Sequence, residues 1–154
     1  MTSTHKWKRL ADNKEIALLD YLKKWILENP EHKLYIGCDS HNMASKTAFA
    51  TVIVLHYSSG GGHVIYTKET LPRIKNRHER LWMEVQSSVE TAMYLMENGI
   101  EKPNHIDVDL NPDPQYKSNS VLRAALGLIE SIGIEPRYKT KSPWSISIAD
   151  KTCR

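Results

Sequence analysis

Acidic side chains that follow predicted strands are the residues of this chain best suited to chemistry. Asp39 and His41 close the stretch Lys33–His41 (KLYIGCDSH), which is typical of a short, nearly continuous apolar strand. A strand with apolar side chains on both faces lies inside a sheet, so we expect the carboxylate at its end to be held rigidly at the sheet's rim. Ligand-binding sites of α/β folds lie at this rim, at the carboxyl ends of the strands. The structural alternative is a turn, because Asp, Ser and Asn commonly begin loops.

Glu84 is the second candidate, on a predicted helix between the apolar positions Leu81 and Val85. A carboxylate on the apolar side of a helix costs free energy unless it is paired or binds a metal. The alternative to a ligand role is a salt bridge on the helix flank, with Arg80 or Arg77 as the partner.

Asp107 and Asp109 lie two residues apart on a predicted strand over 105–110, so they share one face. If this strand runs parallel to the first and beside it, Asp109 comes close to Asp39. For Asp107 we expect a solvated or capped strand carboxylate. Asn111 is either an outer ligand or a turn former.

Asp150, near the end of the chain, is by default a surface charge. Carboxylates that converge on one sheet edge repel one another, and divalent cations with hard oxygen ligands, Mg²⁺ or Mn²⁺, resolve that repulsion. Two such ions about 4 Å apart clamp the attacking and leaving oxygens of a phosphodiester. The candidate chemistry is therefore phosphodiester hydrolysis.

The predicted elements must bring these acids together. We expect, in chain order, a helix over 12–28 with an Asp12–Glu15 capping box, strands over 33–41, 47–57 and 63–71, a helix over 76–98, a strand over 105–110, a helix over 118–132 and a strand over 136–140. Short loops make the first three strands an antiparallel meander, and the later strand–helix–strand crossovers imply parallel strands. In the long helix the inward residues are expected to be Leu81, Val85, Ser88, Val89, Ala92, Met93 and Met96. We therefore predict one α/β domain over residues 1–154, with a mixed five-stranded sheet and the N-terminal helix as an addition.

Composition sets limits on partners and location. The 154 residues carry a formal net charge of +3, which permits a nucleic-acid partner without requiring one. No apolar run could span a bilayer, and Met1–Leu10 lacks the apolar core of a secretory signal. Cys38 and Cys153 have no metal-type spacing, which indicates a reducing, cytoplasmic location.

Basic residues gather in two segments of the chain. The first is Lys68, Arg73, Lys75, Arg77, His78 and Arg80, and the second is Arg137, Lys139, Lys141, Lys151 and Arg154, with Tyr138 and Trp144 among them. Backbone phosphates bind such cations, and aromatic rings can stack on single-stranded bases. The alternative is an ordinary solvated surface, with Trp144 packed inside.

The order of elements, with an Asp at the end of the first strand, a Glu in the first crossover helix and an Asp at the end of the fourth strand, resembles the ribonuclease H-like superfamily. The segment Met83–Ala92 is similar to the Glu-bearing helix of that superfamily. More narrowly, four short motifs resemble the YkuK-type family of predicted ribonuclease H-like proteins: Gly37–His41, Asp109–Pro112, Tyr116–Asn119 and Ala149–Lys151.

The resemblance implies a ribonuclease H-like fold and metal-dependent cleavage of RNA, DNA or a hybrid. It assigns Asp39, Glu84 and Asp109 to the metal core, with Asp150 as a fourth, late ligand. Asp39 would bridge two Mg²⁺ or Mn²⁺ ions. His41 either orients the attacking water, stabilises the scissile phosphate or caps its loop.

Asp113 is a rival for the ligand at the strand end, since Asp113–Tyr116 also resembles a piece of the superfamily's fourth-strand motif. We prefer Asp109 because Pro112 and Pro114 place Asp113 in a turn beyond the strand. Two other functions compete with a nuclease: a non-catalytic nucleic-acid-binding module on the same scaffold, and a plain interaction domain.

Overall fold

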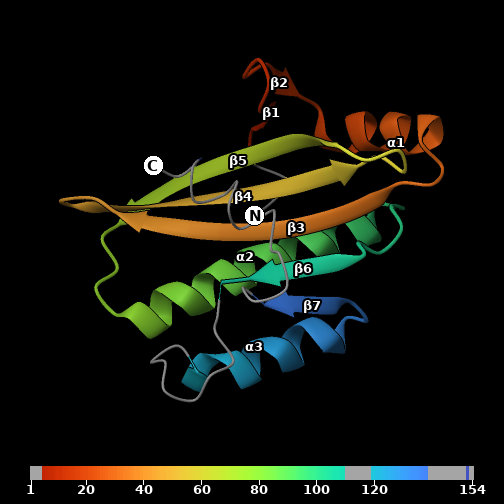
Figure 1. Cartoon of the computed structure of the whole chain (residues 1–154). Coiled ribbons are helices and arrows are strands. Elements are labelled where there is room, and N and C mark those ends of the chain that lie inside the picture. Colours follow the sequence, from red (N-terminus) through yellow and green to blue (C-terminus); the bar gives the residue numbers. More distant parts are fainter. Residues whose placement is uncertain (1–4, 110–118, 139–151, 153–154) are drawn as a thin grey trace.

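A seven-stranded mixed sheet organises this computed structural model, which describes residues 5–109, 119–138 and 152 (Figure 1). The strands lie in the order β2-β1-β5-β4-β3-β6-β7, with bounds β1 Trp7–Arg9, β2 Glu15–Ile16, β3 Lys33–Asn42, β4 Lys46–His56, β5 Gly62–Pro72, β6 His105–Val108 and β7 Glu135–Tyr138. The described helices are α1 Leu18–Glu28, α2 Arg77–Glu97 and α3 Asn119–Ser131. The fold is mixed α/β, with antiparallel and parallel strands in one sheet, as predicted.

The meander of β3, β4 and β5 forms the centre of the sheet, and both of its pairings are antiparallel. The β4–β5 turn contains Gly60 and Gly61 at φ +96° and +77°, a left-handed backbone that glycine adopts without steric cost. β6 then pairs parallel to β3, and β7 pairs parallel to β6. The two crossover helices, α2 and α3, lie on the same face of the sheet (Figure 1).

The N-terminal region differs from the predicted helix over 12–28. The helix begins at Leu18, and the short strands β1 and β2 precede it and extend the sheet beyond β5. The proposed capping box does not form, because Asp12 accepts hydrogen bonds from Arg9 and from the backbone of Lys14. Asn13, at φ +57°, completes this tight turn, and the five-stranded prediction was therefore two strands short.

α2 begins where the sequence predicts, because the Asn76 side chain accepts a hydrogen bond from the backbone N–H of Glu79. It ends before Gly99, which has φ +87°. Its buried residues are Leu81, Glu84, Val85, Ser88, Val89, Thr91, Ala92 and Leu95. Met93 was placed wrongly in the interior, since its side chain is 40% exposed.

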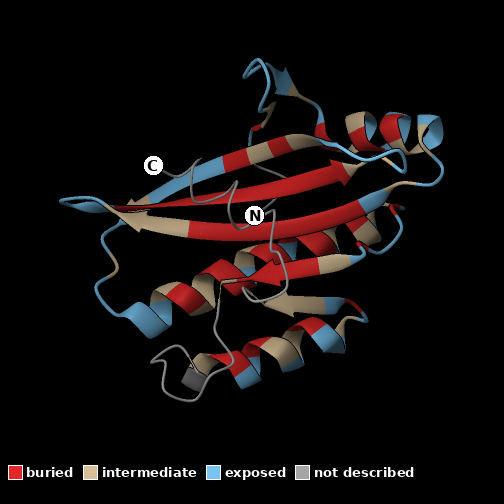
Figure 2. Ribbon diagram, viewed as in Figure 1, coloured by how far each residue is buried: buried red, intermediate tan, exposed pale blue. Residues whose placement is uncertain are grey.

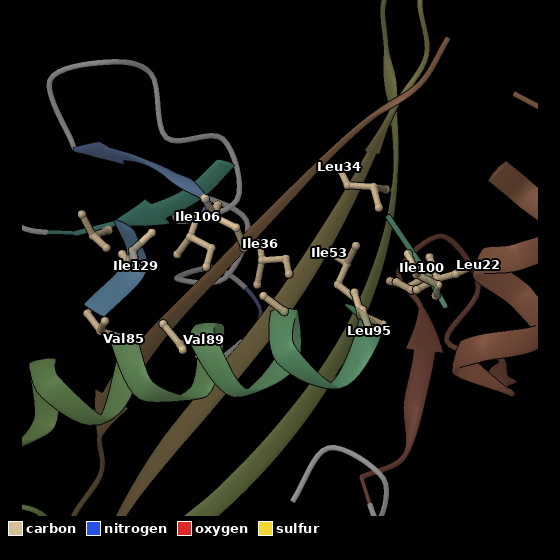
Figure 3. Close-up of a cluster of buried hydrophobic side chains, with 14 of the residues drawn as sticks. Leu22, Leu34, Ile36, Ile53, Val85, Val89, Leu95, Ile100, Ile106 and Ile129 are labelled. Carbon is tan, nitrogen blue, oxygen red and sulfur yellow. The ribbon is translucent and has the colours of Figure 1, made fainter. Parts of the chain in front are cut away.

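One apolar core joins the sheet to the helices. Ile36 of β3, Ile53 of β4 and Ile106 of β6 pack against α2, where Val85 and Val89 point back at the sheet (Figure 3). α1 joins the same core through Leu22, and α3 through Ile129. The burial pattern runs red through β4 and along the inner side of α2 (Figure 2). Among the helices of the described residues, none combines the length and apolarity that a bilayer crossing needs.

Candidate functional site

The site lies where the pairing between β3 and β6 ends. These strands are parallel and in register over Tyr35–Gly37 and His105–Asp107, with Gly37 opposite Asp107. Two residues further along each strand stand Asp39 and Asp109, so continuing the register brings these two acids opposite each other. The sequence predicted that the strand ends near Asp39. β3 instead continues to Asn42 beside β4. What ends near Asp39 is only the pairing with β6.

Alternation along β3 distributes its side chains over two faces. Ile36 and Ser40 face α2, and Asp39 lies on the opposite face. Asp39 is nevertheless only 8% exposed, because the strand that carries it is interior to the sheet. Asp109, one residue beyond the end of β6, is half-buried.

Glu84 approaches from α2 and is 5% exposed. Its carboxylate accepts a hydrogen bond from the hydroxyl of Ser40. Burial raises the pKa of Glu84 well above its ordinary value, and the charges of Asp39 and Asp109 raise it further. The Ser40 hydrogen bond and the positive charge of Arg80 act in the opposite direction. Glu84 therefore interacts electrostatically with both strand acids.

The flank salt bridge considered for Glu84 does not form. None of the ion pairs among the described residues includes Glu84, and neither Arg80 nor Arg77 closes on its carboxylate. Arg80, one helical turn before Glu84, acts only through its charge. Among the described residues, the donor that holds the buried Glu84 carboxylate is the neutral hydroxyl of Ser40.

Asp107 has a different role from the one expected, because it is buried rather than solvated. Its side chain is inaccessible and accepts two hydrogen bonds from Arg137, at 2.8 and 3.0 Å. The Arg137 guanidinium also lies over the ring of Tyr35, 4.3 Å from its centroid. The Arg137 guanidinium is therefore engaged by Asp107 and Tyr35 and does not extend the second basic segment.

The three acids share one region without forming a closed ligand cluster. Across the part of the chain that the structure describes, no three His, Cys, Asp or Glu side chains come close enough together to hold one ion. Glu84 approaches from α2 and its carboxylate is turned toward Ser40, while continuing the β3–β6 register sets Asp39 opposite Asp109. The donors are carboxylate and hydroxyl oxygens, which suit Mg²⁺ or Mn²⁺.

Several predicted residues lie outside the described residues. These are Asn111, Asp113, Asp150 and, in the second basic segment, Lys139, Lys141, Trp144, Lys151 and Arg154. His41 is described and is half-buried on β3, on the same face as Asp39. The first basic segment runs from β5 through the start of α2, where Arg77 and His78 are exposed.

Ser40 is the residue at this site whose role was missed. It was noted only as part of the motif Gly37–His41, and its contact with Glu84 joins β3 to α2 across 44 residues of sequence. A usable signal existed: the residue after Asp39 on a buried strand must point toward the helix that covers the sheet, and a hydroxyl there needs a polar partner.

Comparisons with known proteins bear on the family of this chain. No curated protein matches the chain. Among solved structures, the chain is similar to RNase H1 from the halophilic archaeon Halobacterium salinarum NRC-1, with 14% identity, a TM-score of 0.39 and coverage of 78% of this chain and 98% of that one. The family model described as "Ribonuclease H-like" matches residues 17–154, nearly the whole chain. The chain therefore belongs to the ribonuclease H-like family.

Proposed function

We propose that this chain is a divalent-metal-dependent nuclease that hydrolyses phosphodiester bonds of RNA, DNA or a hybrid. The observation that carries the proposal is the electrostatic contact of Glu84 with Asp39 and Asp109, three acids from separate segments at one edge of strand pairing. A fold gathers buried acids at a free-energy cost, and such groups concentrate at functional sites.

The residues fit Mg²⁺ or Mn²⁺ in chemistry. Asp39, Glu84 and Asp109 would hold the ions, Asp39 would bridge them, and Asp150 would be the fourth ligand. Bound there, the ions would activate water and stabilise the leaving oxygen in a two-metal mechanism. Ser40 orients the Glu84 carboxylate, and His41 either orients the attacking water or contacts the phosphate.

The test is Asp39→Asn, screened against labelled RNA, DNA and hybrid substrates with Mg²⁺ and with Mn²⁺. We expect loss of metal-dependent cleavage, with unchanged circular dichroism and thermal unfolding. Asp20→Asn is the matched control, because Asp20 is an exposed acid on α1 and undergoes the same chemical change. Cleavage retained by Asp39→Asn would refute the assignment.

A non-catalytic nucleic-acid-binding module is the second candidate. It is favoured by the lack, within the described residues, of three ligand side chains already gathered around one point. This function predicts salt-sensitive binding of nucleic acid without turnover at any concentration of divalent ion. Calorimetric titration with Mn²⁺, compared between the native chain and Asp39→Asn, separates the two candidates.

A further inference from the structure

We propose that Arg80 is a catalytic residue whose guanidinium contacts the non-bridging oxygens of the scissile phosphate. This inference rests on the proposed nuclease function and adds a residue to it. The relevant reaction is hydrolysis: a water oxygen forms a bond to phosphorus and loses a proton to solvent. The phosphorus bond to the leaving oxygen breaks, and that oxygen takes up a proton.

Arg80 is placed beside the acids by the helix that carries Glu84. The two residues are four apart on α2, so their side chains lie on the same side of the helix, one turn apart. Arg80 is half-buried, and its charge reaches the Glu84 carboxylate. The guanidinium therefore lies within electrostatic range of Glu84.

Among the described residues, neither an ion pair nor a hydrogen bond of its Nε atom accounts for this arginine. Its Nε atom is enclosed and has no hydrogen-bond partner, although a buried donor without a partner costs free energy. It forms no ion pair within the described residues, and an Arg that precedes Glu by four residues is the less favourable order for a helix pair. It also lies at the end of the first turn of α2, and the helix dipole disfavours cations in that turn.

The segment before α2 is hydrogen-bonded to the hairpin of β3, which carries Asp39, and β4. The backbone N–H of Ile74 donates to the Thr47 hydroxyl at 2.9 Å, and the Asn42 amide donates to the Ile74 carbonyl at 3.3 Å. The backbone N–H of Arg73 donates to the carbonyl of Ser45 at 3.1 Å. These bonds tie the segment before α2 to the end of the β3–β4 hairpin, so Arg80 is held at a fixed position relative to β3.

The charge of the substrate explains why an arginine is needed here. A phosphodiester is an anion, and carboxylates that are not fully neutralised repel it. A planar guanidinium can donate two parallel hydrogen bonds to phosphate oxygens, which a lysine cannot do. Exposed Arg77, three residues earlier on α2, adds a further positive charge to this end of the helix.

The experiment compares Arg80→Ala, Arg80→Lys and the control Arg123→Ala, which removes an equal charge from the exposed side of α3. We measure single-turnover cleavage with saturating enzyme, and binding of a short fluorescein-labelled RNA by anisotropy with Ca²⁺ in place of Mg²⁺. We expect Arg80→Ala to slow cleavage about 100-fold, the scale of losing one donor to a developing charge. Added guanidinium ion, below denaturing concentrations, should restore part of that rate, and Arg80→Lys should stay slow.

The outcomes distinguish the role of Arg80 from the nuclease function itself. Cleavage by Arg80→Ala at the rate of the Arg123→Ala control overturns the role of Arg80 and leaves the nuclease function standing. If the native chain cleaves nothing but Arg80→Ala binds RNA at least tenfold more weakly than the control, the nuclease function fails and the phosphate contact survives. If there is neither cleavage nor such a difference in binding, both proposals fail.

Discussion

Replacing Arg137 by Met is the most direct test of how the sheet is built beside the candidate site. The change removes both hydrogen bonds to Asp107 and keeps a long apolar side chain over Tyr35. The Asp107 carboxylate stays inaccessible to solvent but loses its bidentate partner. We expect a large loss of stability, since removing the cationic partner of a buried carboxylate is costly.

The magnitude follows from the burial of the pair. The Asp107 side chain is 0% exposed and that of Arg137 is 18% exposed, so solvent screens the pair little. Breaking such a pair from one side costs about 3–5 kcal/mol. For a domain of this size, that loss corresponds to a fall in Tm of roughly 6–20 °C.

Urea unfolding followed by circular dichroism, together with thermal melts, measures this loss. The double variant Asp107→Val with Arg137→Met should recover most of it, because a buried pair replaced by apolar side chains is often neutral or stabilising. The control Arg123→Ala, at an exposed position on α3, should change the free energy of unfolding little. A loss below about 1 kcal/mol in Arg137→Met would refute the reasoning, since that is the range of a solvated surface pair.

Two further predictions concern α2. The raised pKa of Glu84 means that the native state keeps this proton to higher pH than the unfolded chain does. The contribution of this proton to stability is fully present below the ordinary pKa of 4.5 and is lost as the pH rises through the folded pKa. Glu84→Gln has no such group, so its free energy of unfolding should rise relative to that of the native chain as the pH rises. Urea unfolding in EDTA measures the difference. A free energy of unfolding of Glu84→Gln that falls relative to that of the native chain as the pH rises would contradict this. Asn76→Ala should cost about 1 kcal/mol by removing the cap of α2, whereas Asn76→Asp should cost little, and equal losses in the two variants would show that the cap is unimportant.

Local patterns were sufficient for most of the fold. Alternating and β-branched residues predicted the meander, and Asn76 and Gly99 marked both ends of α2, because caps and stops depend on a few neighbouring residues. The N-terminal helix was started too early because Asp12 fits a capping box in sequence. Its carboxylate instead accepts hydrogen bonds from Arg9 and Lys14 in the turn that joins β1 to β2.

Asp107 and Asp109 show most clearly the difference between what the sequence predicts and what the tertiary structure decides. From the sequence, Asp107 and Asp109 are equivalent acids on one face of a strand. In the structure, Arg137 from β7 neutralises Asp107, while Asp109 lies one residue beyond β6 and acts on Glu84. Which acid receives a cation as its partner depends on the neighbouring strand, and that neighbour is not determined by any local pattern.

The sequence by itself determined which residue types stand at the ends and centres of the elements, because hydrophobic periodicity, caps and turns act over a few residues. It placed Asp39, Glu84 and Asp109 on their elements and indicated an α/β fold with a mixed sheet. Only the tertiary structure decided how these acids meet. Strand register, the approach of α2 and the Ser40 hydrogen bond all arise from contacts between residues far apart in the chain. The electrostatic cost borne by Glu84 therefore exists only in the folded protein.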